Sequence, residues 1–336
     1  MIINIILCIL FIIIFYLINN YINNYSIKNE RYYNFSITPF PIDFVYTWKG
    51  EIYSDNIRES YNNELQYSLR SIQEYAPWYN KIYILTDPPK KLPSWIKMNN
   101  KIIMVDTSET FPDISYLPNS NSNAIETTIS NIKNLSEHYI YLCDDIFIGK
   151  PIPFTIFFTF DGKAKIDKKC IFNNYILKNT NNNILNINYP LSVSKFYPHV
   201  PIPQLKSSVI KFLNTYPKYI EWIRRTNNRV GTGEELCKKY FLSNTCQQIH
   251  YPICKYMYIQ KKAVFIDYNK NDIVFIMNNN MYATNGTCLL NRLLTIKPLF
   301  FCINDDEKDI IQRKKIKSDM LKFFKNYYPK KSEFEK

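Results

Sequence analysis

The stretch LPNSNSNAIETTISNIKNLSEHYIYLCDDIFIG, residues 117–149, decides the expected fold. Apolar residues recur at three- and four-residue spacing over 124–135, which predicts an amphipathic helix with Ser122 and Glu126 at its start. The run YIYLC at 139–143 is aromatic and β-branched and carries no charge, as in a strand covered on both faces. Because this strand ends at Asp144 and Asp145, it brings two carboxylates to its carboxyl edge.

That edge is where ligands bind in open α/β sheets. Two adjacent carboxylates there repel each other unless a cation or a basic group lies between them. The alternative is an ordinary Asp-rich turn that caps a strand. The sequence alone leaves both interpretations open.

Further strands alternate with helices along the chain. Apolar runs at 42–48, 81–87 and 101–106 predict strands, and helical spacing marks residues 64–75. This order predicts an α/β fold with a mainly parallel, Rossmann-like sheet flanked by helices. The chain has no G-x-G-x-x-G and no G-x-x-x-x-G-K-[ST], which argues against a dinucleotide dehydrogenase and a P-loop enzyme.

The later half is less regular. Its pattern predicts an Asn-rich excursion or hairpin at 172–190, helices at 197–213, from 217 to 225 and after Gly231, a strand-rich stretch at 263–281, and a late strand within 297–306 that ends in acidic residues.

The N-terminal stretch IINIILCILFIIIFYLI, residues 2–18, is apolar except for Asn4 and is near the shortest length that spans a hydrocarbon core. No small-residue cleavage site follows, which predicts an uncleaved transmembrane signal anchor over 1–20, a stem over 21–40 and a folded domain from residue 41. We expect that domain in an ER- or Golgi-like lumen or otherwise outside the cytoplasm. Lys28 and Arg31 taken alone favour the opposite orientation.

The net charge of +13 over 336 residues suits an acidic partner such as a nucleotide, a sugar phosphate or an anionic membrane surface. The basic segment 311–336 is expected to be a solvated amphipathic tail, and nucleic-acid binding is the lesser alternative.

The chain has eight cysteines and no C-x-x-C pair, which argues against a zinc site. One or two disulfides are expected among Cys237, Cys246, Cys254 and Cys288. Cys143 and Cys302 are expected to be buried thiols.

Several blocks of the sequence resemble the Stealth family in the same order. These blocks are IDFVYTW, NELQYSLRSIQEYAPW, KIYILTD, LPNSNSNAIE, YIYLCDDIFIG and FFCINDD, and they span about residues 41–306. That family comprises microbial capsular polysaccharide phosphotransferases and the α/β subunit of the lysosomal-enzyme N-acetylglucosamine-1-phosphotransferase. The resemblance implies a hexose-1-phosphate transferase domain over 41–310 that depends on Mg²⁺ or Mn²⁺.

The implied reaction moves a sugar 1-phosphate from a nucleotide sugar, UDP-linked by expectation, to a hydroxyl of a glycan or glycoprotein, and releases a nucleoside monophosphate. A metal-dependent glycosyltransferase that releases a nucleoside diphosphate is an alternative from the same chemistry. An inactive, membrane-tethered glycan-binding protein is a second alternative. Gln66 and Cys143, which stand where the family usually has Arg and Asn, motivate it.

The implied site residues fall into three groups. The catalytic group is Glu126, Asp145, His199 and Arg229, the metal ligands are Asp144, Asp145 and Asp305, and the substrate-binding residues are Thr47, Trp48, Arg70, Asp87 and Asn304.

The residue types suit the reaction. Carboxylates hold hard divalent cations, a guanidinium binds phosphate oxygens, and His199 or Glu126 could take the acceptor's proton. Structural alternatives remain for several of them. His199 lies among prolines, Arg229 follows a basic pair, Glu126 could complement a helix dipole, and Arg70 could pair with an acid.

Overall fold

The computed structural model describes residues 37–50, 63–87, 92–167, 199–226, 249–269, 271–277, 281–282, 288–304, 307 and 309–336. The chain divides into two compact units, residues 1–37 and 38–336, and nearly all described residues belong to the second. The predicted anchor and most of the predicted stem lie outside the described residues. Within the part that is described, no helix is both long and apolar enough to cross a membrane.

The strands are β1 (Ile42–Thr47), β2 (Ile82–Thr86), β3 (Ile102–Asp106), β4 (His138–Cys143), β5 (Ile146–Ile148), β6 (Ala164–Asp167), β7 (Ile202–Leu205), β8 (Ala263–Ile266), β9 (Ile273–Met277) and β10 (Phe300–Asn304). The helices are α2 (Glu64–Tyr75), α3 (Ser122–Glu126), α4 (Lys206–Thr215), α5 (Pro217–Arg225), α7 (His250–Ile259), α8 (Leu289–Ile296) and α9 (Ile310–Tyr327).

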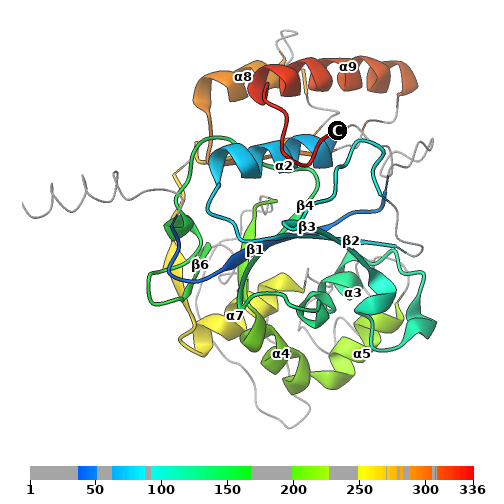
Figure 1. The fold of residues 1–336 in the computed structure, drawn as a ribbon, viewed down its shortest axis with the longest axis vertical. Helices are drawn as coiled ribbons and strands as arrows, with labels where there is room; N and C mark the ends of the chain where they lie inside the picture. The colour runs from blue at the N-terminus through cyan, green and yellow to red at the C-terminus, as the bar shows by residue number, and fades with distance from the viewer. Residues whose placement is uncertain are drawn as a thin grey trace, which may run out of the picture. The chain divides into compact units, whose positions relative to one another are not determined.

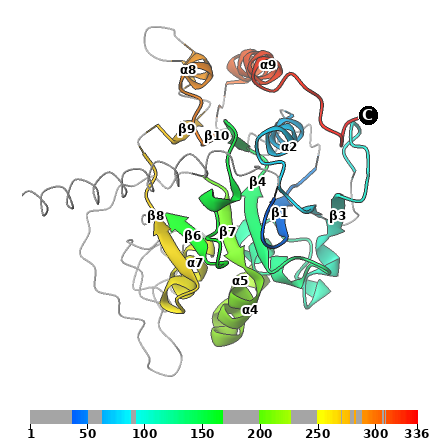
Figure 2. The ribbon, with the colours of Figure 1, turned by 60° about the vertical axis from the view of Figure 1, so that its left-hand side comes forward.

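A five-stranded sheet in the order β3-β2-β1-β4-β7 forms the centre of the unit. Strands β3, β2, β1 and β4 run parallel, and β7 is antiparallel to β4. Helices cover both faces: α2 lies on one side with α8 and α9 beyond it, and α3, α4, α5 and α7 lie on the other (Figures 1 and 2). The predicted mixed α/β class with a mainly parallel sheet flanked by helices is therefore confirmed.

The inner strands of the central sheet are buried. In β1 the five residues Ile42–Tyr46 are all buried, Asp43 included, and β2 is buried along its whole length, as in strands that are covered on both faces. A three-stranded sheet, β5-β10-β9, and a two-stranded sheet, β6-β8, complete the described strands.

The helix expected over 124–135 is shorter than predicted. α3 ends at Glu126 because the next two side chains, Thr127 and Thr128, bond back to carbonyls three residues earlier at 2.7 and 2.8 Å. Such bonds compete with helical ones. The helix is also capped by Asn121 and not by Ser122.

The helix expected over 197–213 begins instead with strand β7, and α4 starts only at Lys206. Pro203 lies inside β7 and has no N–H to donate. This is tolerated because β7 is an edge strand with a partner on one side only, β4.

Cys254 and Cys288 are free thiols, so the disulfides predicted for either of them are wrong. Cys237 and Cys246, the excursion at 172–190 and the helix after Gly231 lie outside the described residues.

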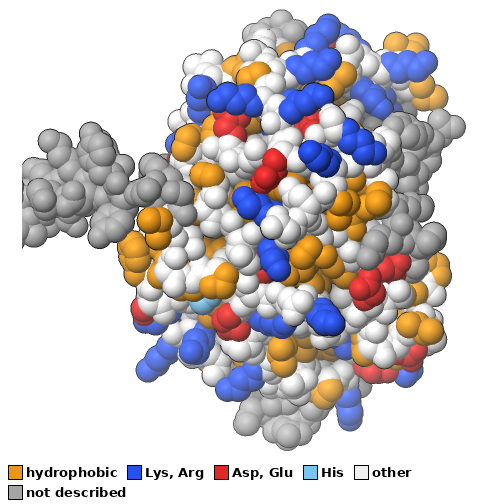
Figure 3. Space-filling model, viewed as in Figure 1, with side chains coloured by type: hydrophobic (Ala, Val, Ile, Leu, Met, Phe, Trp, Pro, Cys, Tyr) orange, Lys and Arg blue, Asp and Glu red, His pale blue; other side chains and the backbone are white. Residues whose placement is uncertain are grey.

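The segment expected to be a basic tail is packed onto the domain. α9 buries Ile316, Met320, Phe323, Phe324 and Tyr327, and Tyr67 of α2 stacks on Phe324 with ring centroids 4.9 Å apart. Its lysines face outward, and basic side chains gather over α8 and α9 (Figure 3).

Beyond α9 the chain ends in a buried ion pair. The Arg70 guanidinium of α2 donates to both carboxylate oxygens of Glu335 at 2.8 and 2.7 Å, and to the carbonyl of Tyr328 at 2.8 Å. Burial opposes ionisation of Glu335, but hydrogen bonds from Arg70, the Ser332 backbone and Gln66 lower its pKa overall. The pair ties α2 to the last residues of the chain.

We expect Arg70→Ala to lower the free energy of unfolding by about 3–5 kcal/mol, because it leaves the Glu335 carboxylate buried without its partner. Denaturant unfolding measures this loss. The matched control is Lys101→Ala, since Lys101 and Glu333 form an ion pair at 3.5 Å with both side chains more than 40% exposed. That control should cost about 1 kcal/mol at most. Equal losses in the two variants would contradict the structural importance of the buried pair.

Candidate active site

Asp144 and Asp145, here called the acidic turn, follow directly on β4 at the carboxyl edge of the parallel strands. The register places Cys143 beside Thr47, so the ends of β4 and β1 are level. After the turn, β5 pairs antiparallel with β10. The backbone N–H of Ile303 donates to the Asp145 carbonyl at 3.2 Å. The turn therefore lies between the central sheet and the three-stranded sheet β5-β10-β9.

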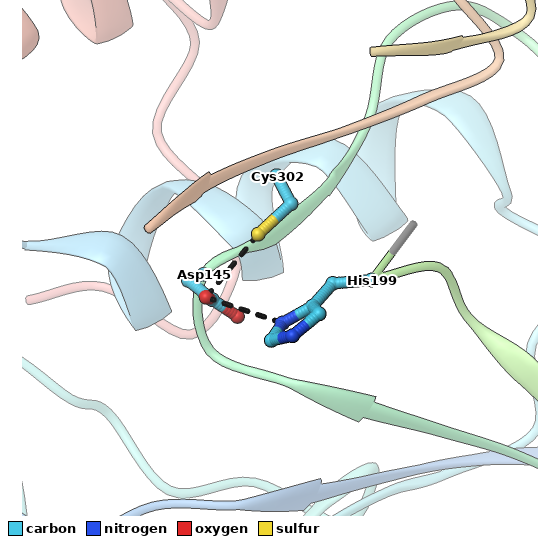
Figure 4. A group of neighbouring side chains, drawn as sticks. All are labelled: Asp145, His199 and Cys302. Atoms are coloured by element: carbon cyan, nitrogen blue, oxygen red, sulfur yellow. Dashed lines mark hydrogen bonds and ion pairs between the residues drawn. The ribbon is translucent and has the colours of Figure 1, made fainter. Parts of the chain in front are cut away.

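Three side chains from distant parts of the sequence meet at this turn (Figure 4). The Cys302 thiol donates to Asp145 Oδ2 at 3.2 Å, and His199 Nδ1 lies 3.7 Å from the same oxygen. His199 precedes β7, and Cys302 lies in β10. The structure thus brings together two predicted catalytic residues, Asp145 and His199.

The acidic turn concentrates negative charge. Burial, followed by the charges of Asp145 and Glu64, raises the pKa of Asp144 well above its ordinary value. Burial and Asp145 likewise raise the pKa of Cys302, which agrees with a protonated thiol that donates a hydrogen bond. A bound cation or a basic ligand would relieve this accumulation.

The residues fit a divalent cation. Asp145 Oδ1 is buried and has no hydrogen-bond partner among the described residues, and the Asp144 carboxylate is adjacent. These are the oxygen donors that Mg²⁺ and Mn²⁺ prefer. Asp305, the third predicted ligand, lies outside the described residues, and Asn304 is the last residue of β10.

Glu126 belongs to a second, buried cluster behind the strand ends. His250 Nδ1 lies 3.0 Å from its Oε2, and the Tyr141 hydroxyl donates to its Oε1 at 3.2 Å. The same hydroxyl is 3.2 Å from Thr47 Oγ1. A chain of polar groups therefore runs from His250 to the end of β1.

The immediate sequence neighbours of His250, Ile249 and Tyr251, carry no charge. Its partner Glu126 is 124 residues away, so no local pattern could reveal the pair. The one available signal was the resemblance, which implied a catalytic role for Glu126.

The other predicted substrate-binding residues are distributed along the strand ends. Thr47 ends β1 and Trp48 follows it, Asp87 follows β2, and Asn304 ends β10. Arg70 differs, because its guanidinium is occupied by Glu335 and Tyr328. These contacts give no support to substrate binding by Arg70. Arg229 lies outside the described residues.

The geometry defines a mixed α/β protein with an acidic, cation-compatible site at the carboxyl edge of its central sheet. Two family descriptions match the chain: Stealth protein CR2, conserved region 2, over residues 58–166, and Stealth protein CR4, conserved region 4, over residues 291–336. The capsular polysaccharide phosphotransferase LcbA of Neisseria meningitidis is 30% identical over 307 residues, which cover 80% of this chain and 78% of LcbA. The chain belongs to the Stealth family.

Two further relatives are also named polysaccharide phosphotransferases. The exopolysaccharide phosphotransferase cps2G of Lactiplantibacillus plantarum is 28% identical, with 90% of this chain and 98% of that protein covered. The capsular polysaccharide phosphotransferase fcs1 of Haemophilus influenzae is 37% identical over 150 residues, which are 38% of this chain and only 41% of fcs1. Among solved structures, an active-site mutant of LgtC superimposes with a TM-score of 0.40 and 11% identity, over 83% of this chain and 95% of that one.

We expect Asp144→Asn to raise the melting temperature at pH 7 in the presence of a chelator. Ionised Asp144 destabilises the folded state because its folded pKa exceeds its unfolded one, and the amide carries no charge. The gain should shrink as the pH falls and vanish below ~3.9, where the carboxyl is protonated in both states. The control is Asp113→Asn, since hydrogen bonds from Ser115 lower the pKa of that exposed residue. If Asp144→Asn leaves the melting temperature at pH 7 unchanged or lower, the raised pKa assigned to Asp144 is contradicted.

The Glu126–His250 contact predicts energetic coupling between the two residues. A double-mutant cycle with Glu126→Gln and His250→Asn should give an interaction energy of about 0.5–3 kcal/mol in unfolding experiments. Additive effects within about 0.3 kcal/mol would show that the two side chains do not interact in the folded protein.

Proposed function

We propose that this chain transfers a sugar 1-phosphate from a nucleotide sugar to a hydroxyl of a glycan or glycoprotein and releases a nucleoside monophosphate. The observation that carries the proposal is the Asp145–His199 pair on the acidic turn, at the sheet edge where α/β proteins bind ligands. The phosphotransferase names of the relatives support the reaction class. We further propose a hexose 1-phosphate and a UDP-linked donor.

In this reaction the acceptor oxygen attacks the donor phosphorus that carries the sugar. The bond from that phosphorus to the bridging oxygen breaks, and the bridging oxygen leaves with the nucleoside monophosphate. The acceptor's proton must pass to a base.

Exposure favours His199 as this base. Its side chain is 29% exposed and so is reachable by an acceptor, whereas that of Glu126 is 7% exposed and already held by His250 and Tyr141. The Asp145 carboxylate near Nδ1 would stabilise the imidazolium that forms. Glu126 is better suited to hold Tyr141 and Thr47 in position.

We propose that Asp145, with Asp144, holds Mg²⁺ or Mn²⁺. When bound, the cation would neutralise charge on the donor's phosphate oxygens. Asp305, Asn304 and Arg229 remain proposed members of the same phosphate-binding region.

Asp145→Asn should reduce kcat by ~10²–10³, because the change keeps the side-chain shape and removes the negative charge that would hold the cation against the donor phosphates. Asp113→Asn is the control. Asp113 caps a short turn at Ile114–Tyr116 by accepting from the Ser115 N–H, and Asn caps equally well. Turnover is measured for both variants at saturating Mg²⁺ and Mn²⁺. An Asp145→Asn enzyme within a few-fold of wild type would remove the acidic turn from the mechanism.

A panel of nucleotide sugars tests the reaction class. With acceptor present, the proposal predicts release of nucleoside monophosphate. Release of nucleoside diphosphate alone would identify a glycosyltransferase, and no metal-dependent turnover of any donor would favour the glycan-binding alternative.

A further inference from the structure

We propose that Asp145, His199 and Cys302 form a binding site for Zn²⁺, or for another divalent metal that accepts sulfur and nitrogen ligands. The site overlaps the hard-cation position of the proposed function but differs from it in donor chemistry. The binding itself is independent of the reaction, and only its inhibitory consequence rests on the proposed function.

The spacing of the donor atoms suits a tetrahedral metal. Cys302 Sγ and His199 Nδ1 lie 3.2 and 3.7 Å from Asp145 Oδ2, and one ligand atom from each residue lies within 4.8 Å of the others. Zn²⁺ binds N, O and S at about 2.0–2.3 Å, so neighbouring ligands of a tetrahedron lie roughly 3.3–3.7 Å apart. One ion could therefore reach all three atoms with small side-chain adjustments.

Donor chemistry selects the metal class. Thiolate and imidazole favour Zn²⁺, whereas Mg²⁺ prefers oxygen. Binding would displace the thiol proton of Cys302, as metals do when they coordinate cysteine. Asp145 Oδ1, which has no hydrogen-bond partner among the described residues, would remain free to adjust to the ion.

The backbone holds the three donors on separate elements. Cys302 is fixed by the pairing of β10 with β5, in which it lies opposite Ile146. The ring of His199 packs 5.5 Å from that of Phe275 in β9. Three protein ligands leave a fourth position open, the arrangement that lets a small ligand or water reach the ion.

The proposed site runs against the expectation drawn from the absence of C-x-x-C. That spacing detects zinc ligands that are close in sequence, whereas these three residues are brought together only by the fold.

Occupation would have two consequences. The ion would link the acidic turn to β10 and to the segment before β7, and so stabilise the fold. It would also engage the Asp145 carboxylate and the imidazole that the proposed reaction uses, and so inhibit transfer.

Direct binding tests the site. Zn²⁺ is titrated into the metal-free full chain in competition with a chromophoric chelator, for wild type, Cys302→Ser and the control Cys288→Ser. Cys288 is also a free thiol, at the start of α8. We expect one competing site per chain in wild type and Cys288→Ser, and at least a tenfold weaker site in Cys302→Ser, roughly the least that loss of a metal-site partner costs.

Co²⁺ provides a spectroscopic readout of sulfur ligation. Wild type and Cys288→Ser should show a sulfur-to-cobalt charge-transfer band, and Cys302→Ser should not. His199→Gln, at a partly exposed position, is the second variant should Cys302→Ser fail to fold, and it should weaken Zn²⁺ binding comparably. Equal Zn²⁺ affinity in wild type, Cys302→Ser and His199→Gln would overturn the proposal. Such a result would leave Mg²⁺-dependent transfer intact, so the two proposals fail separately.

Discussion

The antiparallel pairing of β5 with β10 is the constraint on which the candidate site depends. β5 is only three residues long, yet it follows the acidic turn directly and aligns Cys302 with Ile146. Without that pairing, the turn would project from β4 with nothing across from it. The pairing also links β10 through β5 and the acidic turn to β4 of the central sheet. α2 and α9 pack against β5, where the Ile148 N–H donates to Ser71 and Phe147 contacts Phe324. Residues more than 150 positions apart therefore share one site.

Charge at this junction makes the acidic turn suited to binding a cation. Two adjacent carboxylates in a partly buried turn cost free energy, as the raised pKa of Asp144 shows, and a folded protein recovers that cost when a cation binds. The Glu126–His250 pair, in contrast, is buried, and its two side chains contact each other at 3.0 Å. One cluster is thus open to ligands and the other supports the strand ends from behind. The donors around Asp145 further imply that different metals would compete for the same carboxylate.

The local sequence pattern predicted the strands and helices that local interactions determine. The mainly apolar runs of β1, β2 and β4 and the helical spacing of α2 are visible in sequence because a buried regular element carries a run or a period of apolar residues. β7 was not predicted because it contains Pro203, which is unusual in a strand. The length of α3 was overestimated because hydrogen bonds from the hydroxyls of Thr127 and Thr128 end the helix. At the site, Asp145 was expected, but its contacts with His199 and Cys302 and the partner of Glu126 were not. An acid was an open alternative as the partner of Arg70, but the sequence did not identify it as Glu335. All of these depend on contacts between residues far apart in sequence, which no spacing encodes.

The fate of the donor's sugar-bearing phosphorus tests the central claim most directly. A nucleotide sugar labelled with radioactive phosphorus at that position is incubated with the full chain, the divalent cation and a glycan acceptor, and the products are separated. Transfer of a sugar 1-phosphate places the label in the glycan, joined through a phosphodiester, and leaves the nucleoside monophosphate unlabelled. Label recovered in nucleoside diphosphate, with an unlabelled glycan that has gained a sugar, would contradict the account.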